Sequence, residues 1–143
     1  MRHMAGHFAA SRLTLRDLID WMLTCQALHD SVDWGRVQDI STEFGMTGFV
    51  SAINDIIEQR FGISIPLRFT HDTDIANKVE HDIVYGNVDI CSVDGVQRLL
   101  WKLRRWNVLA WKRQLVYSDS PLSLMLASLS SHVEKPRSIL HKM

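Results

Sequence analysis

The helical character of the chain is clearest in residues 47–62, which read TGFVSAINDIIEQRFG. Apolar residues recur there at intervals of three and four, as they do on one face of an α-helix. They are Phe49, Val50, Ile53, Ile56 and Ile57. Thr47 is placed to cap the start of this helix, and Gly62 is placed to end it. The pattern predicts a helix with a buried apolar stripe.

Similar signals mark helices on both sides of this one. Thr14 and Asp17 have the spacing of a capping box, which predicts a helix behind them. Asp33 is a good N-cap for a helix that runs to Phe44 and stops at Gly45. Residues 75–85 keep helical spacing up to a glycine at position 86, and one long helix is predicted to begin near Asp94 and run through residues 96–116.

The chain predicts one all-α domain over residues 1–143, with six to seven helices in a compact bundle. Its 143 residues are 46% hydrophobic, which is enough for a core. A last helix is expected to open with Ser120 as N-cap and Pro121 at its first position. Residues 63–69, ISIPLRF, form at most a short extended segment, because Pro66 restricts it to an edge strand. Helix-compatible residues begin almost at once, so we expect the C-terminal fragment of a longer chain.

The stretch THDTDI, residues 70–75, places two carboxylates one residue apart. Such a pair, here Asp72 and Asp74, can hold Mg²⁺ for phosphoryl or nucleotidyl transfer. It can also cap the helix that follows, because short acidic side chains accept the free N–H groups of a first turn. The pair follows no Gly-Ser turn, and the sequence contains no Gly-Ser dipeptide. We therefore favour a helix cap, with no catalytic residue and no metal ligand in this chain.

The long helix carries the clearest candidate for binding. At 100° per residue its cations gather on one narrow face, beside a wide apolar arc that predicts a central helix. The cations are Arg98, Lys102, Arg105, Lys112 and Arg113. A solvated face or docking surface is the favoured interpretation, followed by contact with phosphates or another polyanion. Nucleic acid is the least expected partner, because the tryptophans mostly lie away from the cations.

The zero net charge hides an asymmetry. Residues 1–95 carry 14 acids and 7 Lys or Arg, whereas residues 96–143 carry 2 acids and 9 Lys or Arg. This polarity suits a partner surface, an anionic ligand or, as we favour, attraction between the two halves. No apolar run reaches 18 residues, which excludes a transmembrane helix. Cys25 and Cys91 form no CxxC unit, so we expect reduced thiols in a cytoplasmic protein.

Two pairs of residues have the spacing of one helical turn. His3 and His7 could bind a metal together, but no third ligand is evident, so packing or hydrogen-bonding histidines are favoured over metal or ligand binding. Both remain candidate substrate-binding residues, with Arg98, Lys102, Arg105 and Lys112. Arg16 and Asp20 are interpreted as an ion pair that holds neighbouring helices in register rather than as catalytic groups.

An ordered set of short motifs resembles the uncharacterised nucleotidyltransferase family of bacteria, whose polymerase-beta-like catalytic half precedes a helical half. The matching residues are His3, His7 and Phe8; Leu15, Arg16, Leu18, Asp20 and Trp21; Val32, Asp33 and Trp34; Glu43, Gly45 and Phe49; Asp82 and Ile83; Trp111 and Lys112; Tyr117, Ser118 and Asp119; and a K-P-x-S-I run from Lys135.

The resemblance implies that this chain is the helical accessory domain of a Mg²⁺-dependent nucleotidyltransferase. Its partners would be the missing N-terminal catalytic half, an NTP and an acceptor. Mg²⁺ would bind that missing half, and this chain alone would be inactive and need no cofactor. The alternative is a stand-alone helical module that binds a partner or polyanion through its basic helix. The sequence contains no P-loop, GxGxxG or GxSxG motif.

Overall fold

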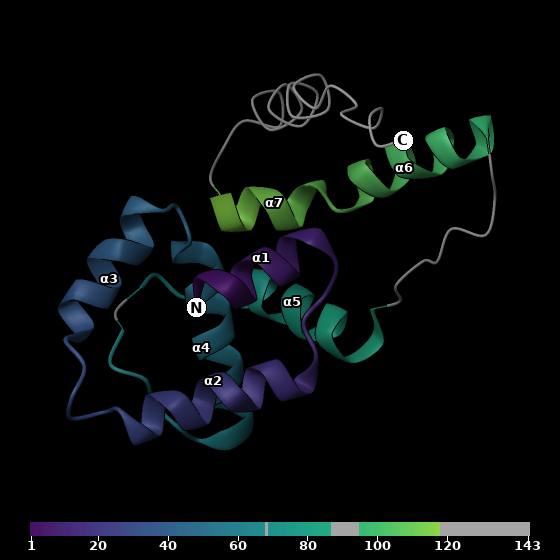
Figure 1. Cartoon of the computed structure of the whole chain (residues 1–143). Coiled ribbons are helices and arrows are strands. Elements are labelled where there is room, and N and C mark those ends of the chain that lie inside the picture. The colour runs from purple at the N-terminus through teal and green to yellow at the C-terminus, as the bar shows by residue number, and fades with distance from the viewer. Residues whose placement is uncertain (68, 87–94, 118–143) are drawn as a thin grey trace, which may run out of the picture.

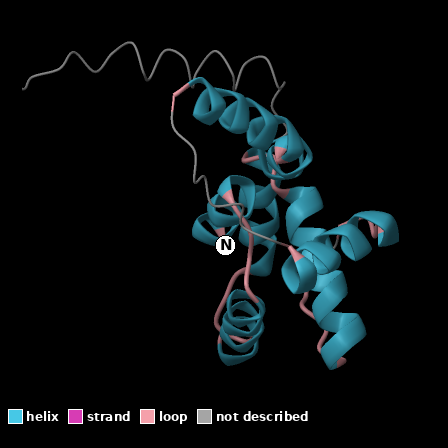
Figure 2. Ribbon diagram, turned by 90° about the vertical axis from the view of Figure 1, so that its right-hand side faces the viewer, coloured by secondary structure: helices cyan, strands magenta, loops and turns pink. Residues whose placement is uncertain are grey.

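A computed structural model of the chain shows an all-α fold, which confirms the predicted class. It describes residues 1–67, 69–86 and 95–117. Within these ranges there are seven helices and no strand (Figures 1 and 2). The helices are α1 (Arg2–Ala10), α2 (Leu15–Ala27), α3 (Trp34–Glu43), α4 (Thr47–Phe61), α5 (Thr73–Tyr85), α6 (Val96–Val108) and α7 (Ala110–Tyr117). The expected helix from Ser120 lies outside the described residues.

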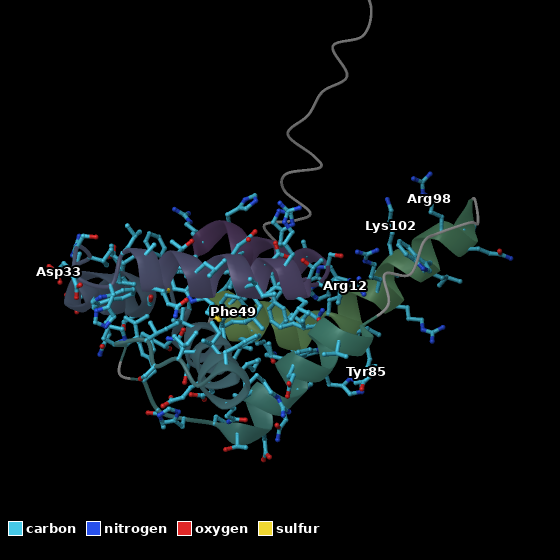
Figure 3. All side chains as sticks on the ribbon, turned by 90° about the horizontal axis from the view of Figure 1, so that it is seen from below. Arg12, Asp33, Phe49, Tyr85, Arg98 and Lys102 are labelled. Carbon is cyan, nitrogen blue, oxygen red and sulfur yellow. The ribbon has the colours of Figure 1, made fainter. Side chains whose placement is uncertain are left out.

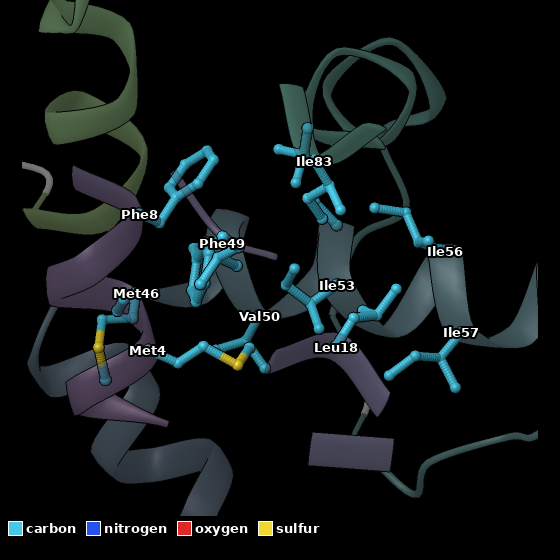
Figure 4. Packing of buried hydrophobic residues seen from close by; sticks show 14 of the residues in the cluster. Met4, Phe8, Leu18, Met46, Phe49, Val50, Ile53, Ile56, Ile57 and Ile83 are labelled. Atoms are coloured by element: carbon cyan, nitrogen blue, oxygen red, sulfur yellow. The ribbon is translucent and has the colours of Figure 1, made fainter. Parts of the chain in front are cut away.

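Helix α4 is the centre of the core, as its apolar stripe predicts. Nine consecutive residues, from Phe49 to Ile57, are buried in it. The helix packs most closely on α5 and also contacts α2, α3 and α7. The rings of Phe49 and Phe8 of α1 lie 5.1 Å apart at the centre of this cluster (Figure 4). Close packing of aromatic and branched side chains from several helices is the main source of stability in such a core.

Most helix ends are where the sequence predicts them. The capping box of Thr14 and Asp17 is formed, and the Asp33 carboxylate accepts the Arg36 N–H at 2.9 Å. Gly62 ends α4 with a positive φ of 67°, a conformation that L-residues rarely adopt. The prediction that Thr47 caps α4 is wrong, because Met46 is the capping residue and supplies no side-chain hydrogen bond.

The segment after α4 alternates between buried and exposed side chains, as an extended chain does. Its described residues form no strand. Ile65 and Leu67 are buried, whereas Ser64 and Pro66 between them are exposed. The Leu67 N–H donates to the Ile65 carbonyl at 2.7 Å, a local turn that takes the place of a sheet partner. The segment therefore packs along α4 by alternate side chains and then enters α5.

The predicted helix over residues 96–116 is divided into α6 and α7 at Leu109. Figure 1 shows the two helices end to end, with α6 extending away from the other helices. Helix α7 packs on α1 and α4, and a Cβ atom added to Gly48 of α4 would lie only 2.8 Å from Leu115. In contrast, none of the described side chains of α6 is buried. The expectation that the whole helix is central is wrong for α6, because its described aliphatic side chains Val96, Leu100, Leu103 and Val108 are exposed.

Candidate functional site

The acid pair begins α5. The Asp72 carboxylate accepts the Ile75 N–H at 3.1 Å, and Asp74 lies in the first turn. Both side chains are exposed. Among the described residues, no group of three or more His, Cys, Asp or Glu side chains has a geometry that could hold a metal ion. The prediction of a helix cap is confirmed.

The cations of α6 divide into two groups. Arg98, Lys102 and Arg104 are exposed, and their side chains make no hydrogen bond or ion pair with any described residue. Arg98 and Lys102 point into solvent from α6 (Figure 3). Arg105 faces α1 instead, donating to the Ala10 carbonyl at 3.3 Å, with its guanidinium 5.3 Å from the Trp101 ring. Of the predicted cationic face, Arg98 and Lys102 are therefore in solvent, with Arg105 at its edge against the body of the protein.

An apolar surface lies on the opposite side of α6 from Arg105. Val96 is 74% exposed, and Leu100 and Leu103 are each 60% exposed. At 100° per residue these three side chains share one face, whose centre lies about 170° around the helix from Arg105. Since Arg105 contacts α1, this face is directed away from the body of the protein. We call Val96, Leu100 and Leu103 the outer face of α6.

Lys112 does not belong to the exposed ridge, and its predicted place in water is wrong. Its side chain is buried, and Nζ donates to Asp82 Oδ2 and to the Ser11 carbonyl, each at 2.6 Å. Burial lowers the pKa of the Lys112 ammonium, and the bond to Asp82 only partly offsets this effect. Lys112 thus joins α7 to α5 and to the end of α1. A helical wheel that treats residues 96–116 as one continuous helix cannot predict the burial of Lys112, because the helix breaks at Leu109.

Arg113 is also held within the protein. Its guanidinium donates to the Trp106 carbonyl and lies 4.1 Å from the Trp106 ring centre. The tryptophans of this region are partly buried against cations, as with Trp101 and Arg105. One cation of the chain therefore lies over each of the Trp101 and Trp106 rings.

A polar cluster that the sequence analysis missed lies between α4 and the segment before α5. His71 Nδ1 donates to Oδ1 of the buried Asp55, and the Ser51 hydroxyl donates to the Thr70 carbonyl at 2.9 Å. Asn54 accepts the Trp21 indole N–H at 3.4 Å, while its buried Nδ2 has no partner in the described part of the chain. Ser51, Asn54, Asp55 and His71 line one pocket. The feature of the sequence that could have indicated this cluster is the polar pair Asn54 and Asp55, which interrupts the apolar residues of α4.

This cluster fastens the segment to α4 rather than forming an evident reaction centre. Asp55 is held by His71, and Ser51 is bonded to backbone, so neither is presented as a nucleophile or base to an open cleft. A buried water would satisfy Asn54 Nδ2, since buried polar groups are nearly always paired. The hydrogen bonds of Ser51 and Asp55 thus hold the segment before α5 against α4.

His3 and His7 lie together on the exposed face of α1, and a hydrogen bond of 3.0 Å joins their Nε2 atoms. The two histidines are thus hydrogen-bonded to each other, as one of the expected interpretations has it. Arg16 and Asp20 approach to 3.6 Å along α2, with side chains 88% and 65% exposed. They pair within one helix and do not link neighbouring helices. The six candidate binding residues therefore form no common site: two lie on α1, three on α6 and one inside the protein.

Several motifs that carry the family resemblance have structural roles in this fold. Trp111 packs edge-on against Phe8 at 5.5 Å and also lies under the Lys78 ammonium. Asp82 and Lys112 form the buried pair, and Asp33 caps α3. These roles explain why a helical domain needs such residues, independently of any reaction.

No family model matches the chain, and searches of curated proteins and of solved structures found no match either. None of the helices described has the length and apolar character required to span a lipid bilayer.

Proposed function

We propose that this chain is a helical binding domain that docks through α6 onto a second protein surface. The observation that carries the proposal is the outer face of α6, three exposed aliphatic side chains on a helix with no buried side chain among those described. Arg98, Lys102 and Arg104 accompany this face on the same helix. An amphipathic helix that leaves its apolar side open is a common recognition element, which lays that side into a groove.

The chemistry of α6 specifies the partner. The apolar outer face fits an apolar groove, and Arg104, about 70° from the centre of that face at 100° per residue, fits an acidic rim beside it. Arg98 and Lys102 lie on the other side of the helix, at 100° per residue. A nucleic acid would use the cations but gain nothing from Leu100 and Leu103. Stacking on bases also needs open aromatic faces, and Trp101 and Trp106 are partly buried, each with an arginine over its ring. An acidic protein groove is therefore the best match.

The family resemblance suggests what the partner is. A bacterial polymerase-beta-like catalytic half, placed upstream, would supply the groove and the Mg²⁺, NTP and acceptor sites. The chain would then be its cytoplasmic accessory domain, and α6 would hold the two halves together. The role of Asp72 as a helix cap supports placing the metal ligands in the other half, because this carboxylate already accepts a backbone N–H of α5.

The test uses the polypeptide encoded immediately upstream, produced separately and mixed with this chain. Sedimentation velocity measures complex formation for the wild type and for Leu100→Ser/Leu103→Ser. We expect at least about tenfold weaker binding for that variant, since two large side chains would lose their buried contacts. Leu15→Ser/Leu23→Ser is the matched control, because these leucines of α2 are exposed to a similar degree. It should bind like the wild type.

Three results would contradict the proposal. Equal affinities of the α6 and α2 variants would mean that the outer face is not the docking surface. Binding of heparin or a short oligonucleotide that is tighter than that of the protein, and depends only on Arg98, Lys102 and Arg104, would identify a polyanion module instead. Pyrophosphate release from an NTP by this chain alone would exclude a purely accessory role.

A further inference from the structure

The histidine pair of α1 has no part in the function proposed above. His3 and His7 lie one turn apart, and both side chains are exposed. Their Nε2 atoms are 3.0 Å apart, the ring centroids are 4.4 Å apart, and the ring planes meet at 82°. The two Nε2 atoms are therefore close enough to bind one metal ion together, once the ring that donates the hydrogen bond carries its proton on Nδ1 instead. Converging imidazoles on a helix face are the simplest protein chelate for a transition metal.

The separation of the two nitrogens indicates which metal they suit. Metal–imidazole bonds of about 2.0–2.1 Å place two ligands about 3.4 Å apart at a tetrahedral angle, but only about 2.9 Å apart at 90°. The observed 3.0 Å is close to the second value. Right angles between ligands are typical of square-planar and tetragonal sites, which Cu²⁺ and Ni²⁺ prefer, and Cu²⁺ binds nitrogen ligands most tightly. We propose that His3 and His7 form a two-imidazole site for Cu²⁺, with Ni²⁺ as the weaker occupant.

The surroundings of the pair suit a cation. Asp17 lies within electrostatic reach of His7: Thr14 hydrogen bonds chiefly lower the Asp17 pKa, and His7 adds a smaller contribution. The cation nearest in sequence, Arg2, is turned toward the Phe44 ring at 4.7 Å. Because both histidines are exposed, water fills the remaining coordination positions. The site is therefore open and takes a metal ion without rearrangement of the core.

Occupancy of this site is linked to folding. The two ligands share the first turns of α1, and the adjacent Phe8 is fully buried against α4 and α7. A metal ion that binds both imidazoles holds this turn in helical form, and any ligand that binds only the folded state stabilises it. Cu²⁺ is thus expected to raise the melting temperature of the wild type and of no variant that lacks either histidine.

The experiment uses the full chain with an acetylated N-terminus, so that the terminal amine cannot coordinate metal beside His3. His132 and His141 are replaced by alanine throughout, which leaves five histidines. Cu²⁺, Ni²⁺ and Zn²⁺ are titrated separately, followed by calorimetry and by electron paramagnetic resonance for Cu²⁺. We expect one Cu²⁺ per chain, two nitrogen ligands in the spectrum, and an affinity order of Cu²⁺ above Ni²⁺ and Zn²⁺.

Single replacements of histidines test which of them bind the metal ion. His3→Ala and His7→Ala should each weaken Cu²⁺ binding at least tenfold, while circular dichroism stays unchanged because alanine favours helix. His29→Ala and His81→Ala are controls, since these exposed histidines lie on other segments and should leave binding intact. The proposal fails if either α1 variant binds Cu²⁺ like the wild type, or if the controls lose as much affinity. Zn²⁺ binding tighter than Cu²⁺ would overturn the assignment of the metal.

Discussion

Helices α6 and α7 follow one another in the chain and have similar compositions, yet they have opposite places in the fold. Both contain tryptophan, aliphatic residues and cations. In α7, Lys112 and Val116 are buried, whereas α6 has no buried side chain among those described. The same kinds of residue therefore serve as core in one helix and as surface in the next.

The difference arises from what lies opposite each helix. Helix α7 contacts α1 and α4, which supply Phe8, a carbonyl at Ser11 and the close approach at Gly48. Helix α6 is tied to the body by Arg105 and by its junction with α7. Amphipathicity alone predicts that a helix will bury one face, but the partner for that face can be another molecule.

The largest expected difference in stability is between replacements of a lysine in α7 and a lysine in α6. Lys112→Met should lower the free energy of unfolding by about 3 kcal/mol, because it leaves Asp82 without its ammonium partner in a mostly buried place. Lys102→Met should change it by less than about 0.5 kcal/mol, since Lys102 is exposed and unpaired among the described residues. Urea denaturation of both variants measures the difference.

A double variant separates a broken pair from poor packing. Lys112→Met/Asp82→Leu removes both charges, and replacing a buried pair by apolar residues is often nearly neutral. We expect it to recover most of the stability lost in Lys112→Met. If Lys112→Met and Lys102→Met cost the same, the contrast between α6 and α7 would not hold in solution.

Hydrogen exchange tests the same contrast in the backbone. Amides of α7 are expected to open only with the core, whereas those of α6 should exchange through local opening. An unsupported helix of 13 residues is marginal in water. For the free chain, we expect protection factors of the backbone amides at least about 100-fold lower in α6 than in α7. Equal protection would show that α6 is held as firmly as the core.

The fold could be predicted where the signal is local. The cap residues Thr14, Asp33 and Asp72 and the stops at Gly45 and Gly62 are set by interactions within four residues, and the structure has the predicted helices there. The apolar stripe of α4 is so continuous that burial follows from hydrophobicity alone. Short-range rules suffice for such elements.

The site residues could be predicted less well, because their roles depend on contacts distant in sequence. Lys112 meets Asp82 across 30 positions and Ser11 across 101. Asp55 meets His71 across 16 positions, through a segment whose path the sequence does not specify. The break at Leu109 also changes which residues share a face, so one wheel for residues 96–116 could not be correct throughout.

Two valines provide a smaller contrast between the helices. Val116 is fully buried in α7, and Val108 is 60% exposed at the end of α6. Val116→Ala should cost about 1–3 kcal/mol through lost burial and the cavity it leaves. Val108→Ala should be neutral or slightly stabilising, because alanine is the better helix former. Thermal or urea unfolding of the two variants measures these changes, and similar losses from both would argue that α6 is packed.

The smallest expected effect is a pH dependence of the Lys112 contribution. Burial lowers the pKa of this ammonium in the folded protein from its ordinary value of 10.5, more than Asp82 raises it. Between the lowered pKa and that of the unfolded chain, the unfolded chain binds more protons. Stability therefore rises with pH across this window, just below about pH 10.5. The advantage of the wild type over Lys112→Met should accordingly grow, by less than about 1 kcal/mol, between pH 8 and 10.

Comparison with the variant isolates this contribution from that of Cys25. Burial raises the pKa of the Cys25 thiol to about 11, so the folded protein keeps a proton that the unfolded chain loses above about pH 9. That effect lowers stability as the pH rises, but it is common to both proteins and cancels in their difference. Urea titrations at several pH values give the difference directly. An advantage that shrinks toward pH 10 would mean that the attraction of Asp82 outweighs the burial of Lys112, and that this pair stabilises α7 more than its burial costs.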